Sequence, residues 1–368
     1  MYMEKKIVIV TNIPSPYRVD LFYYMQTQLK TYEFYIIYTS RNEDNRQWSL
    51  DEGKLLNTTI LKSRIIKIKG KMDNRYIHLP GNIMSCLKDI APSVVIAFEY
   101  NPAALQCLAW CKIHGRKFIH LTDGTLYSER NIGKIQKLAR KIIVSKADTF
   151  IASSSKAKEK LIHWGAPDNK IFISLLTTDV YKYKGVKRGF QAGCILYVGS
   201  MAKRKGLDLL INALANVKEK FSLRVVGHGS EEEIQMLKCL AEKKKILDKI
   251  TWCGFKEGTA LLDEYCKAEI FVLPTREDCF GLVLVEAMCA ALPIIASKYA
   301  EGAYDVVREG VNGYIVDPFD AVAFGETINK VLVDSKMRNG VKEVSYEKFE
   351  FRNVVRGYME AIEFAIKY

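Results

Sequence analysis

The sequence predicts an α/β protein with two parallel-sheet domains. Short apolar runs of strand length alternate with longer amphipathic stretches, and this alternation is typical of parallel sheets covered by helices. It lapses in the polar, glycine-containing stretch 179–192 and then restarts. The chain has 368 residues, enough for two domains of ordinary size. We therefore predict a domain boundary between residues 183 and 184.

The first half shows five apolar runs of strand length, separated by helical patterns. The expected strands are Lys6–Thr11, Phe34–Tyr38, Val94–Ala97, Lys117–Leu121 and Thr149–Ala152. The expected helices are Val19–Leu29, Asn101–His114, Asn131–Ser145 and 153–165. The last of these helices begins with serines and ends at Gly165, which are start and stop signals for a helix.

The second half repeats the pattern. The expected strands are Cys194–Val198, Ser222–Val226, Ile250–Trp252, Ile270–Leu273, Ile294–Ala296 and Gly313–Val316. The expected helices are 205–217, Glu231–Lys245, Leu261–Lys267, Phe280–Ala291, one from Pro318 onward, and one or two within Ser345–Tyr368. Ligands of such sheets bind at the carboxyl ends of the strands. We therefore expect the loops after these strands to face a shared cleft: those after Val10, Leu121, Val198, Val226 and Leu273.

The charge is unevenly distributed. Residues 1–184 hold 29 Lys and Arg against 16 Asp and Glu, whereas residues 185–368 hold 26 of each, so the net charge of +13 belongs to the first half. The basic residues concentrate at Lys62–Arg75 and Lys134–Lys160. A solvated basic face explains this pattern, and so does an anionic membrane surface. Nucleic acid is disfavoured because the sequence has neither a reader motif nor an aromatic platform.

The composition predicts a cytoplasmic protein. No apolar run approaches the ~18–20 residues that cross a bilayer, and the N-terminal strand and polar loop do not resemble a signal peptide. The nine cysteines include no CxxC pair and are expected to be free thiols. Combined with the basic first half, this suggests a peripheral protein on the inner face of the cell membrane.

The stretch 271–297 carries the clearest chemical signal. A buried strand ends before Asp278, a helix is expected to open at Phe280 and Gly281, and Glu286 lies inside that helix. A helix N-terminus favours anions, and carboxylates suit hydroxyl groups, so together they indicate a sugar nucleotide. Ordinary capping of the helix dipole is the alternative explanation for the acids.

Two other strand-end loops narrow the chemistry. The loop after Val198 carries Lys203, Arg204 and Lys205, which suit a diphosphate unless they are merely solvated. The loop 12–18 lacks the glycines of a dinucleotide site, which argues against a dehydrogenase. Its Arg18 either binds an anion or is a surface residue of a structural turn. Neither a Walker loop nor an Asp-x-Asp pair is present, so the sequence predicts no metal and no cofactor.

These residues resemble a known family. The stretch DCFGLVLVEAMCAALPIIAS at 278–297 looks like the signature of the GT4-type retaining glycosyltransferases of the GT-B fold, in which seven residues separate two acids. YVGS with KRKGLDLLI, VVGHGSEEEIQML, WCGF and EGVNGYIVDPFD match the neighbouring elements in order. NIPSPYRVDLF and the closing FEFRNVVRGYMEAIEFA resemble the family more loosely. Three positions depart from its pattern: Asp278 replaces a Glu, Cys279 a Gly and Ser200 an Arg.

The resemblance implies two Rossmann-like domains facing a cleft. The second, 184–351, would bind a nucleotide-sugar donor, and a helix at about 352–368 would return to the first. Transfer would proceed without a metal and with retention of configuration, to a glycan or lipid-linked acceptor in surface polysaccharide synthesis of the capsule or lipopolysaccharide type.

The resemblance also assigns residues to roles. The donor would contact Ser200, Arg204, Lys205, Gly281, Leu282 and Glu286. Lys205 would neutralise the diphosphate, the Gly281 and Leu282 amides would bind phosphate, Glu286 would hold the ribose, and Asp278 would contact the sugar. The acceptor would face Asn12, Tyr17, Arg18 and Asp123. Lys205, Asp278 and Asp123 are therefore the catalytic candidates, whereas His120 is expected to pack inside its strand.

Other functions remain compatible with these residues. One alternative is another GT-B enzyme, such as a sugar-nucleotide epimerase or a phosphorylase, although no lysine-bound cofactor signature of the phosphorylases is present. The other is a non-catalytic nucleotide-sugar-binding partner of a membrane assembly. Ser200 and Asp278 keep this second alternative open, because both depart from the family pattern.

Overall fold

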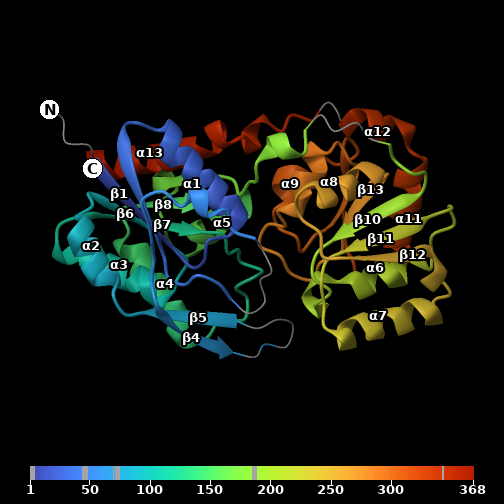
Figure 1. The fold of residues 1–368 in the computed structure, drawn as a ribbon, viewed down its shortest axis with the longest axis horizontal. Coiled ribbons are helices and arrows are strands. Elements are labelled where there is room, and N and C mark those ends of the chain that lie inside the picture. Colours follow the sequence, from blue (N-terminus) through green and yellow to red (C-terminus); the bar gives the residue numbers. More distant parts are fainter. Residues whose placement is uncertain (1–4, 44–48, 69, 71–74, 185–188, 342–343) are drawn as a thin grey trace. The chain divides into compact units, whose positions relative to one another are not determined.

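The computed structural model describes the chain except for residues 1–4, 44–48, 69, 71–74, 185–188 and 342–343. The chain divides into two compact units, one formed by 1–179 with 348–368 and the other by 180–347 (Figure 1). Parts of the expected basic segment Lys62–Arg75 and of the expected linker 179–192 lie outside the described residues.

Unit 1 is built on a parallel sheet. In the described part of the chain its seven strands have the order β3-β2-β1-β6-β7-β8-β9. Their bounds are β1 Lys5–Thr11, β2 Tyr32–Tyr38, β3 Thr58–Ile60, β6 Val94–Phe98, β7 Lys117–Thr122, β8 Thr149–Ala152 and β9 Ile171–Ile173. The helices are α1 Pro16–Gln28, α2 Ile83–Ile90, α3 Pro102–Ile113, α4 Lys134–Lys146, α5 Ser155–His163 and α13 Phe351–Lys367.

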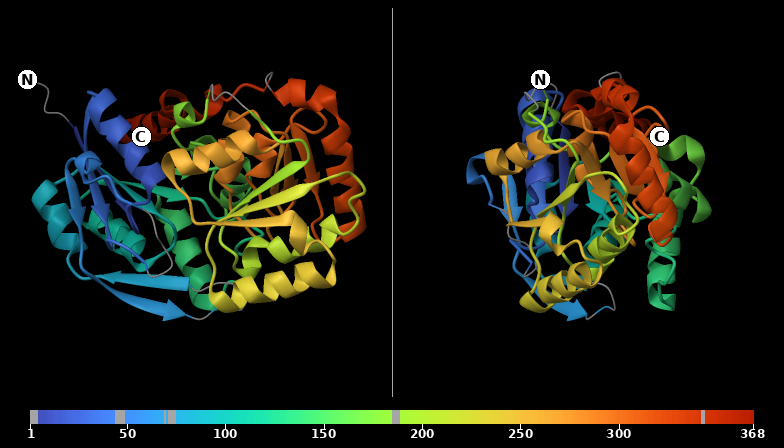
Figure 2. Two further views of the ribbon diagram at one scale, coloured as in Figure 1. Left: turned by 45° about the vertical axis from the view of Figure 1, so that its right-hand side comes forward. Right: turned by 90° about the vertical axis from the view of Figure 1, so that its right-hand side faces the viewer.

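Both faces of this sheet are buried, which explains why its strands read as continuous apolar runs. Along β1, Ile7 and Ile9 pack on the face covered by α1 and α13, whereas Val8 and Val10 pack toward α2 and α3. Figures 1 and 2 show these helices on the two sides of the sheet. The α/β sandwich leaves the strand ends, rather than the faces, available to a ligand.

Unit 2 repeats the architecture. Among its described residues, six parallel strands have the order β12-β11-β10-β13-β14-β15. They are β10 Cys194–Val198, β11 Ser222–Val226, β12 Ile250–Gly254, β13 Ile270–Leu273, β14 Ile294–Ser297 and β15 Gly313–Val316. The helices are α6 Leu207–Leu214, α7 Glu231–Lys243, α8 Gly258–Lys267, α9 Val283–Cys289, α10 Ala303–Val306, α11 Ala321–Val333 and α12 Ser335–Gly340. β13 is next to β10, so their following loops are neighbours.

Helix α13 belongs to unit 1 although it follows unit 2 in the chain. Its apolar face, with Val354, Tyr358 and Ile362, is part of the unit 1 core. The hydroxyl of Ser174 donates to the Val354 carbonyl at 2.9 Å. At Gly357 a β-carbon would lie 2.3 Å from the Ile173 carbonyl oxygen, so only glycine lets the helix pack this closely on β9.

Several elements differ from those the sequence predicted. The basic stretch Lys62–Arg75 alternates charges with isoleucines like an edge strand and loop, and strand β4 Ser63–Ile68 confirms the strand. Its antiparallel pairing with β5 Arg75–Pro80 was not predicted. All residues of β4 after Ser63 are exposed. Strand β9 and helix α2 were not predicted. Helix α1 begins at Pro16 rather than Val19, because proline is tolerated in the first turn.

Candidate active site

Two strand-end loops of unit 2 meet at a lysine and an aspartate. Lys205 ends a 3₁₀ turn, Lys203–Lys205, after β10, and Asp278 lies in the loop after β13. The Lys205 Nζ lies 2.5 Å from Asp278 Oδ2, and each side chain is at most one fifth exposed. The structure therefore brings together two residues that are 73 positions apart and that the sequence had assigned to the donor diphosphate and the sugar.

The second carboxylate oxygen of Asp278 binds backbone amides. Oδ1 accepts from the Gly281 N–H at 3.0 Å and from the Phe280 N–H at 3.3 Å. Gly281 has a left-handed backbone, with φ of 80°, and helix α9 begins only at Val283. The expected helix start at Phe280 is therefore wrong, because the carboxylate folds 278–281 into a tight turn.

This turn bears on the predicted phosphate contacts. The Gly281 amide, expected to bind phosphate, is engaged by Asp278 in this structure. Among the described residues, the Leu282 amide donates to no other group. A donor diphosphate that used both amides would have to displace the carboxylate of Asp278 from Gly281.

Asp278 is ionised at neutral pH. Burial opposes its charged form, but the Lys205 ammonium, the Arg204 guanidinium and the amide hydrogen bond from Phe280 outweigh burial and hold the pKa of the Asp278 carboxyl below its usual value. The site thus contains a fixed anion between two cations. Such an arrangement stabilises charges of either sign that develop on a ligand.

Arg204 holds the two loops together. It donates through Nη1 to the Glu277 carbonyl at 2.9 Å, and its own carbonyl accepts from the Arg276 amide at 2.8 Å. Arg276 in turn makes a two-pronged ion pair with Asp208 on α6, with both contacts at 2.6 Å.

The same loop is also held near its start, where the Ser200 carbonyl accepts from the buried Tyr197 hydroxyl at 2.6 Å. The structure therefore gives Arg204 and Ser200 roles in fixing the loop that precedes Lys205.

Glu286 lies on α9 and is nearly buried, with 9% of its surface exposed. Its Oε2 accepts from the Tyr265 hydroxyl at 2.7 Å, and the hydroxyl of Tyr183 also hydrogen-bonds to the carboxylate. Burial raises the pKa of Glu286, and the two tyrosines together with the charge of Lys182 only partly offset this. Sequence reasoning missed both tyrosines, since neither lies near Glu286 in the chain.

The acceptor-side candidates meet in unit 1. Arg18, on α1, forms an ion pair with Asp123, which follows β7, and its guanidinium carbon lies 4.1 Å from the centre of the Phe98 ring. Oδ1 of Asp123 is buried and has no hydrogen-bond partner among the described residues. A cavity of about 10 Å³, lined in part by Tyr17, Asp123 and Ser153, lies beside the pair and has room for about one water molecule. Arg18 is therefore a partner in an ion pair with Asp123, and not merely a surface residue of a structural turn.

Asn12 and His120 lie close to these residues but differ in role. The Asn12 side chain accepts from the Asn101 amide group at 3.3 Å, which links the loops after β1 and β6. His120 is fully buried, and burial together with Lys160 and Arg140 keeps its pKa well below the usual value. The expectation that His120 packs inside the strand is confirmed.

Glu99 is the residue that sequence reasoning missed in unit 1. Its carboxylate binds the loop that carries Asp123, with the Asp123 amide at 2.6 Å. The available signal was its place directly after β6, at the carboxyl edge of the sheet, but Glu-Tyr-Asn-Pro resembles an ordinary turn.

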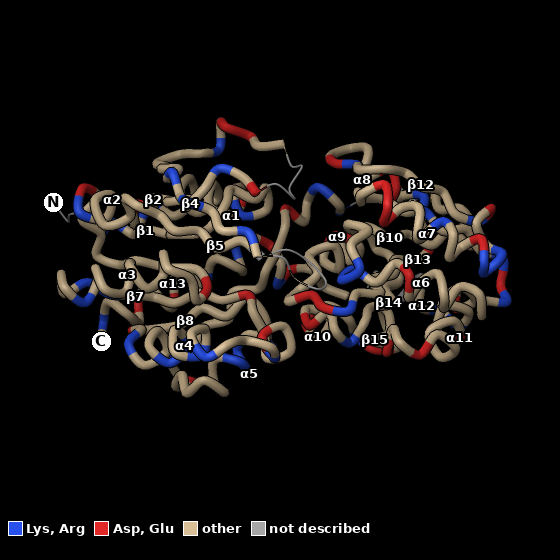
Figure 3. Tube along the Cα trace, turned by 90° about the horizontal axis from the view of Figure 1, so that it is seen from below, with Lys and Arg blue, Asp and Glu red and all other residues tan. Residues whose placement is uncertain are grey.

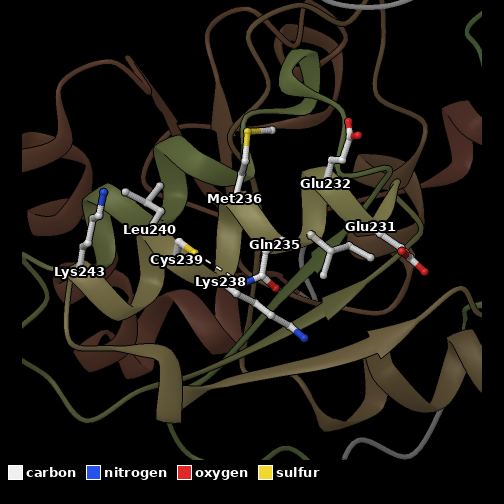
Figure 4. A pocket seen from close by; sticks show the side chains of 9 residues that line it. Glu231, Glu232, Gln235, Met236, Lys238, Cys239, Leu240 and Lys243 are labelled. Atoms are coloured by element: carbon white, nitrogen blue, oxygen red, sulfur yellow. Dashed lines mark hydrogen bonds between the residues drawn. The ribbon is translucent and has the colours of Figure 1, made fainter.

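Neither a second hollow in unit 2 nor a cluster of metal-ligating residues in the described part of the chain offers another candidate site. A shallow hollow of about 890 Å³ follows the outer face of α7, between Glu231 and Lys243, and includes no residue of the candidate site (Figure 4). Among the residues that the structure describes, no three His, Cys, Asp or Glu side chains gather as metal ligands would.

The part of the chain that forms this site matches a family model. Residues 191–348 match the family described as glycosyl transferases group 1. This part of the chain is therefore similar to the glycosyl transferases of group 1. The matched segment contains Lys205, Asp278 and Glu286, so the candidate donor residues lie inside the region that defines the family.

Curated relatives extend the similarity beyond the matched segment. An uncharacterized glycosyltransferase of Methanocaldococcus jannaschii is 30% identical over 47% of this chain and 45% of that protein. Lipopolysaccharide 1,6-galactosyltransferase of Escherichia coli is 26% identical over 67% of both chains. The chain spans about half the length of several curated relatives that it matches, with coverages of 45%, 40% and 51%.

Solved structures show the fold over the whole chain. The HepE protein of Anabaena, determined in complex with UDP-glucose, superimposes with a TM-score of 0.77 at 15% identity, covering 98% of this chain and 100% of that one. The predicted GT-B fold, with two Rossmann-like domains, is therefore confirmed.

Proposed function

We propose that the protein transfers a sugar from a nucleotide-sugar donor to a glycan or lipid-linked acceptor, without a metal ion and with retention of configuration. The convergence of Lys205 and Asp278 at the carboxyl ends of β10 and β13 supports this proposal most directly. The part of the chain that carries them matches a family model of glycosyl transferases. Relatives named for lipopolysaccharide and for a capsule region favour an acceptor in surface polysaccharide synthesis.

The proposed chemistry follows from charge. When the bond between the sugar and the diphosphate breaks, the electron pair goes to the diphosphate oxygen, and positive charge develops on the sugar ring. The Lys205 ammonium would stabilise the diphosphate, and the ionised Asp278 would stabilise the sugar. No Asp-x-Asp pair is available to hold a bridging cation, so lysine and arginine take over the neutralisation.

Glu286 and the acceptor side complete the proposal. Tyr265 and Tyr183 orient the Glu286 carboxylate, whose remaining acceptor capacity suits the hydroxyls of a ribose. In unit 1, Oδ1 of Asp123, which no described residue contacts by a hydrogen bond, suits an acceptor hydroxyl, while Arg18 pairs with the other oxygen.

The first prediction is metal-independent transfer. Incubated with a panel of nucleotide sugars and glycan or lipid-linked acceptors, the full chain should release nucleoside diphosphate at a rate that EDTA leaves unchanged. Nuclear magnetic resonance of the product should show the anomeric configuration of the donor. Loss of activity in EDTA would contradict the metal-free mechanism. A product of inverted configuration would contradict retention. Epimerisation of the donor in the absence of acceptor would indicate an epimerase. Binding of the nucleotide sugar without any turnover would indicate a non-catalytic binding partner.

Helix α4 supports a membrane-bound location. Its outer face exposes Ile135 (85%), Leu138 (57%) and Ile142 (41%) as one stripe, while Ala139 and Ile143 face the unit 1 core. The exposed lysines of the helix are Lys134, Lys137, Lys141 and Lys146. Figure 3 shows basic residues along α4.

An apolar stripe flanked by lysines is typical of helices that lie in the plane of an anionic membrane surface. No helix among the described residues is both long and apolar enough to cross a bilayer. We propose that α4 docks unit 1 on an anionic leaflet such as the cytoplasmic one.

The second prediction tests this docking. Each lysine near an anionic surface contributes about 1 kcal/mol, so Lys137→Gln with Lys141→Gln should weaken binding to phosphatidylserine-containing vesicles about 30-fold. The matched control is Lys243→Gln with Lys244→Gln, which removes two exposed lysines from the end of α7 in unit 2. Co-sedimentation measures both. If the wild-type chain bound neutral vesicles as well as anionic ones, the docking proposal would be contradicted. If the control variant lost as much vesicle binding as the α4 variant, the assignment to α4 would be contradicted.

A further inference from the structure

Glu99 has an unusual backbone conformation. It follows β6 with φ of 58°, in the left-handed region that side chains other than glycine, asparagine and aspartate rarely adopt. Its amide donates to the Leu121 carbonyl at 2.8 Å, which ties it to the end of β7. A strained residue persists where its surroundings fix it, and such residues cluster at functional sites.

The Glu99 carboxylate explains why the strain is retained. Oε1 accepts from the amides of Asp123 at 2.6 Å and Gly124 at 3.1 Å, and Oε2 accepts from the Thr122 hydroxyl at 2.9 Å. One side chain thus satisfies three donors of the loop after β7. Burial raises the pKa of the Glu99 carboxyl, as do the charges of Asp123 and Glu129, whereas the Lys160 charge and the Asp123 amide lower it.

The opposite side of the loop is held by a buried ionic network. The fully buried Lys160 donates to Thr122 Oγ1 at 2.6 Å and to Glu129 Oε1 at 3.1 Å. Arg140 donates to the other oxygen of Glu129 at 2.7 Å. The loop is packed so tightly that a β-carbon on Gly124 would lie 2.6 Å from Glu129.

We propose that Glu99 is a positioning residue for Asp123. It fixes the backbone at 122–124, so that one oxygen of Asp123 contacts Arg18 and the other, Oδ1, has no partner in the described part of the chain. Its effect on sugar transfer rests on the proposed function, because that function assigns Asp123 to the acceptor. Its effect on the loop does not depend on any activity.

The third prediction uses Glu99→Gly, which removes the carboxylate but suits the left-handed backbone. Amide hydrogen exchange of the Asp123 and Gly124 amides should accelerate at least tenfold, while exchange elsewhere in the unit 1 sheet stays unchanged. The matched control is Ala91→Gly, another left-handed residue of unit 1 (φ of 52°), at the end of α2, which should leave the loop unaffected. Glu99→Gln, which keeps an acceptor oxygen, should restore most of the protection.

Unchanged exchange of the Asp123 and Gly124 amides in Glu99→Gly would overturn the proposal. Faster amide exchange across the whole of unit 1 would also overturn it, because that result would mean that Glu99 only stabilises the fold. If Glu99→Gly does not fold, Glu99→Asn replaces it, because asparagine lacks the carboxylate and tolerates the left-handed backbone. Faster exchange confined to 122–124 in that variant decides in favour of the proposal, and unchanged exchange decides against it.

Activity provides a separate readout. In Glu99→Gly, kcat should fall at least tenfold, whereas affinity for the nucleoside diphosphate, measured by calorimetry, should be unchanged because the donor residues lie in unit 2. A lost nucleotide affinity or an unchanged kcat would contradict the positioning role. A wild-type protein that transfers no sugar would refute the proposed function, while the exchange experiment would still decide the role of Glu99.

Discussion

Lys205→Ala is expected to lower the rate of sugar transfer about 10²–10³-fold, the usual cost of losing one preorganised contact to a developing negative charge. The ammonium of Lys205 contacts Asp278 and lies where the loops after β10 and β13 meet. Without it, the departing diphosphate loses its nearest cation in the proposed mechanism. Steady-state kinetics with the preferred donor, at saturating acceptor, measures the loss.

The matched control is Lys203→Ala. Lys203 lies in the same 3₁₀ turn but is exposed, so its removal should change the rate less than about threefold. Thermal unfolding should show that both variants are folded. Near-wild-type turnover of Lys205→Ala, or an equal loss in both variants, would contradict the assignment. Calorimetry with nucleoside diphosphate should also show weaker binding to Lys205→Ala and to Glu286→Gln.

Arg18→Met is expected to lower the free energy of unfolding of unit 1 by about 3–5 kcal/mol, because it removes one partner of a buried ion pair. Arg18 is 7% exposed and pairs with Asp123, and its charge also lies against the Phe98 ring. Without it, both oxygens of Asp123 would lack the compensating cation. Urea denaturation followed by circular dichroism measures the change.

A double variant separates the ion pair from simple packing. Asp123→Asn added to Arg18→Met removes the stranded charge, so the double variant should be about 1–3 kcal/mol more stable than the sum of the single effects indicates. Strict additivity would mean that Arg18 stabilises unit 1 through its contact with Phe98 alone.

The strands could be predicted because both sheets are parallel and buried on both faces. Cys194–Val198 and Ile270–Leu273 are continuous apolar runs, and the structure places β10 and β13 at those bounds. Parallel order then implies that their following loops are neighbours, which is how Lys205 and Asp278 could be assigned to one site. The chemistry of that site was therefore accessible from spacing together with the family resemblance.

The remaining features depend on contacts between distant residues. The turn at 278–281 forms because the Asp278 carboxylate binds the amides ahead of α9, and a sequence pattern places the helix start several residues too early. Glu99 binds the amide of Asp123, 24 positions away, and Tyr265 binds Glu286, 21 positions away. No local sequence pattern identifies either residue. The pairing of β4 with β5 was missed, because these strands form a sheet of their own outside the two parallel sheets, whose buried apolar runs carry the clearest strand signal.

The discontinuity of unit 1 has a consequence during synthesis. Unit 2 is one contiguous stretch, 180–347, whereas unit 1 needs both the first 179 residues and α13. At about 5–20 residues per second, about 10–30 s of translation separate the two parts of unit 1. During that interval α1 alone covers this face of the sheet, and the apolar residues that pack against Val354, Tyr358 and Ile362 lack α13. The nascent chain therefore presents part of this apolar surface to chaperones until α13 emerges.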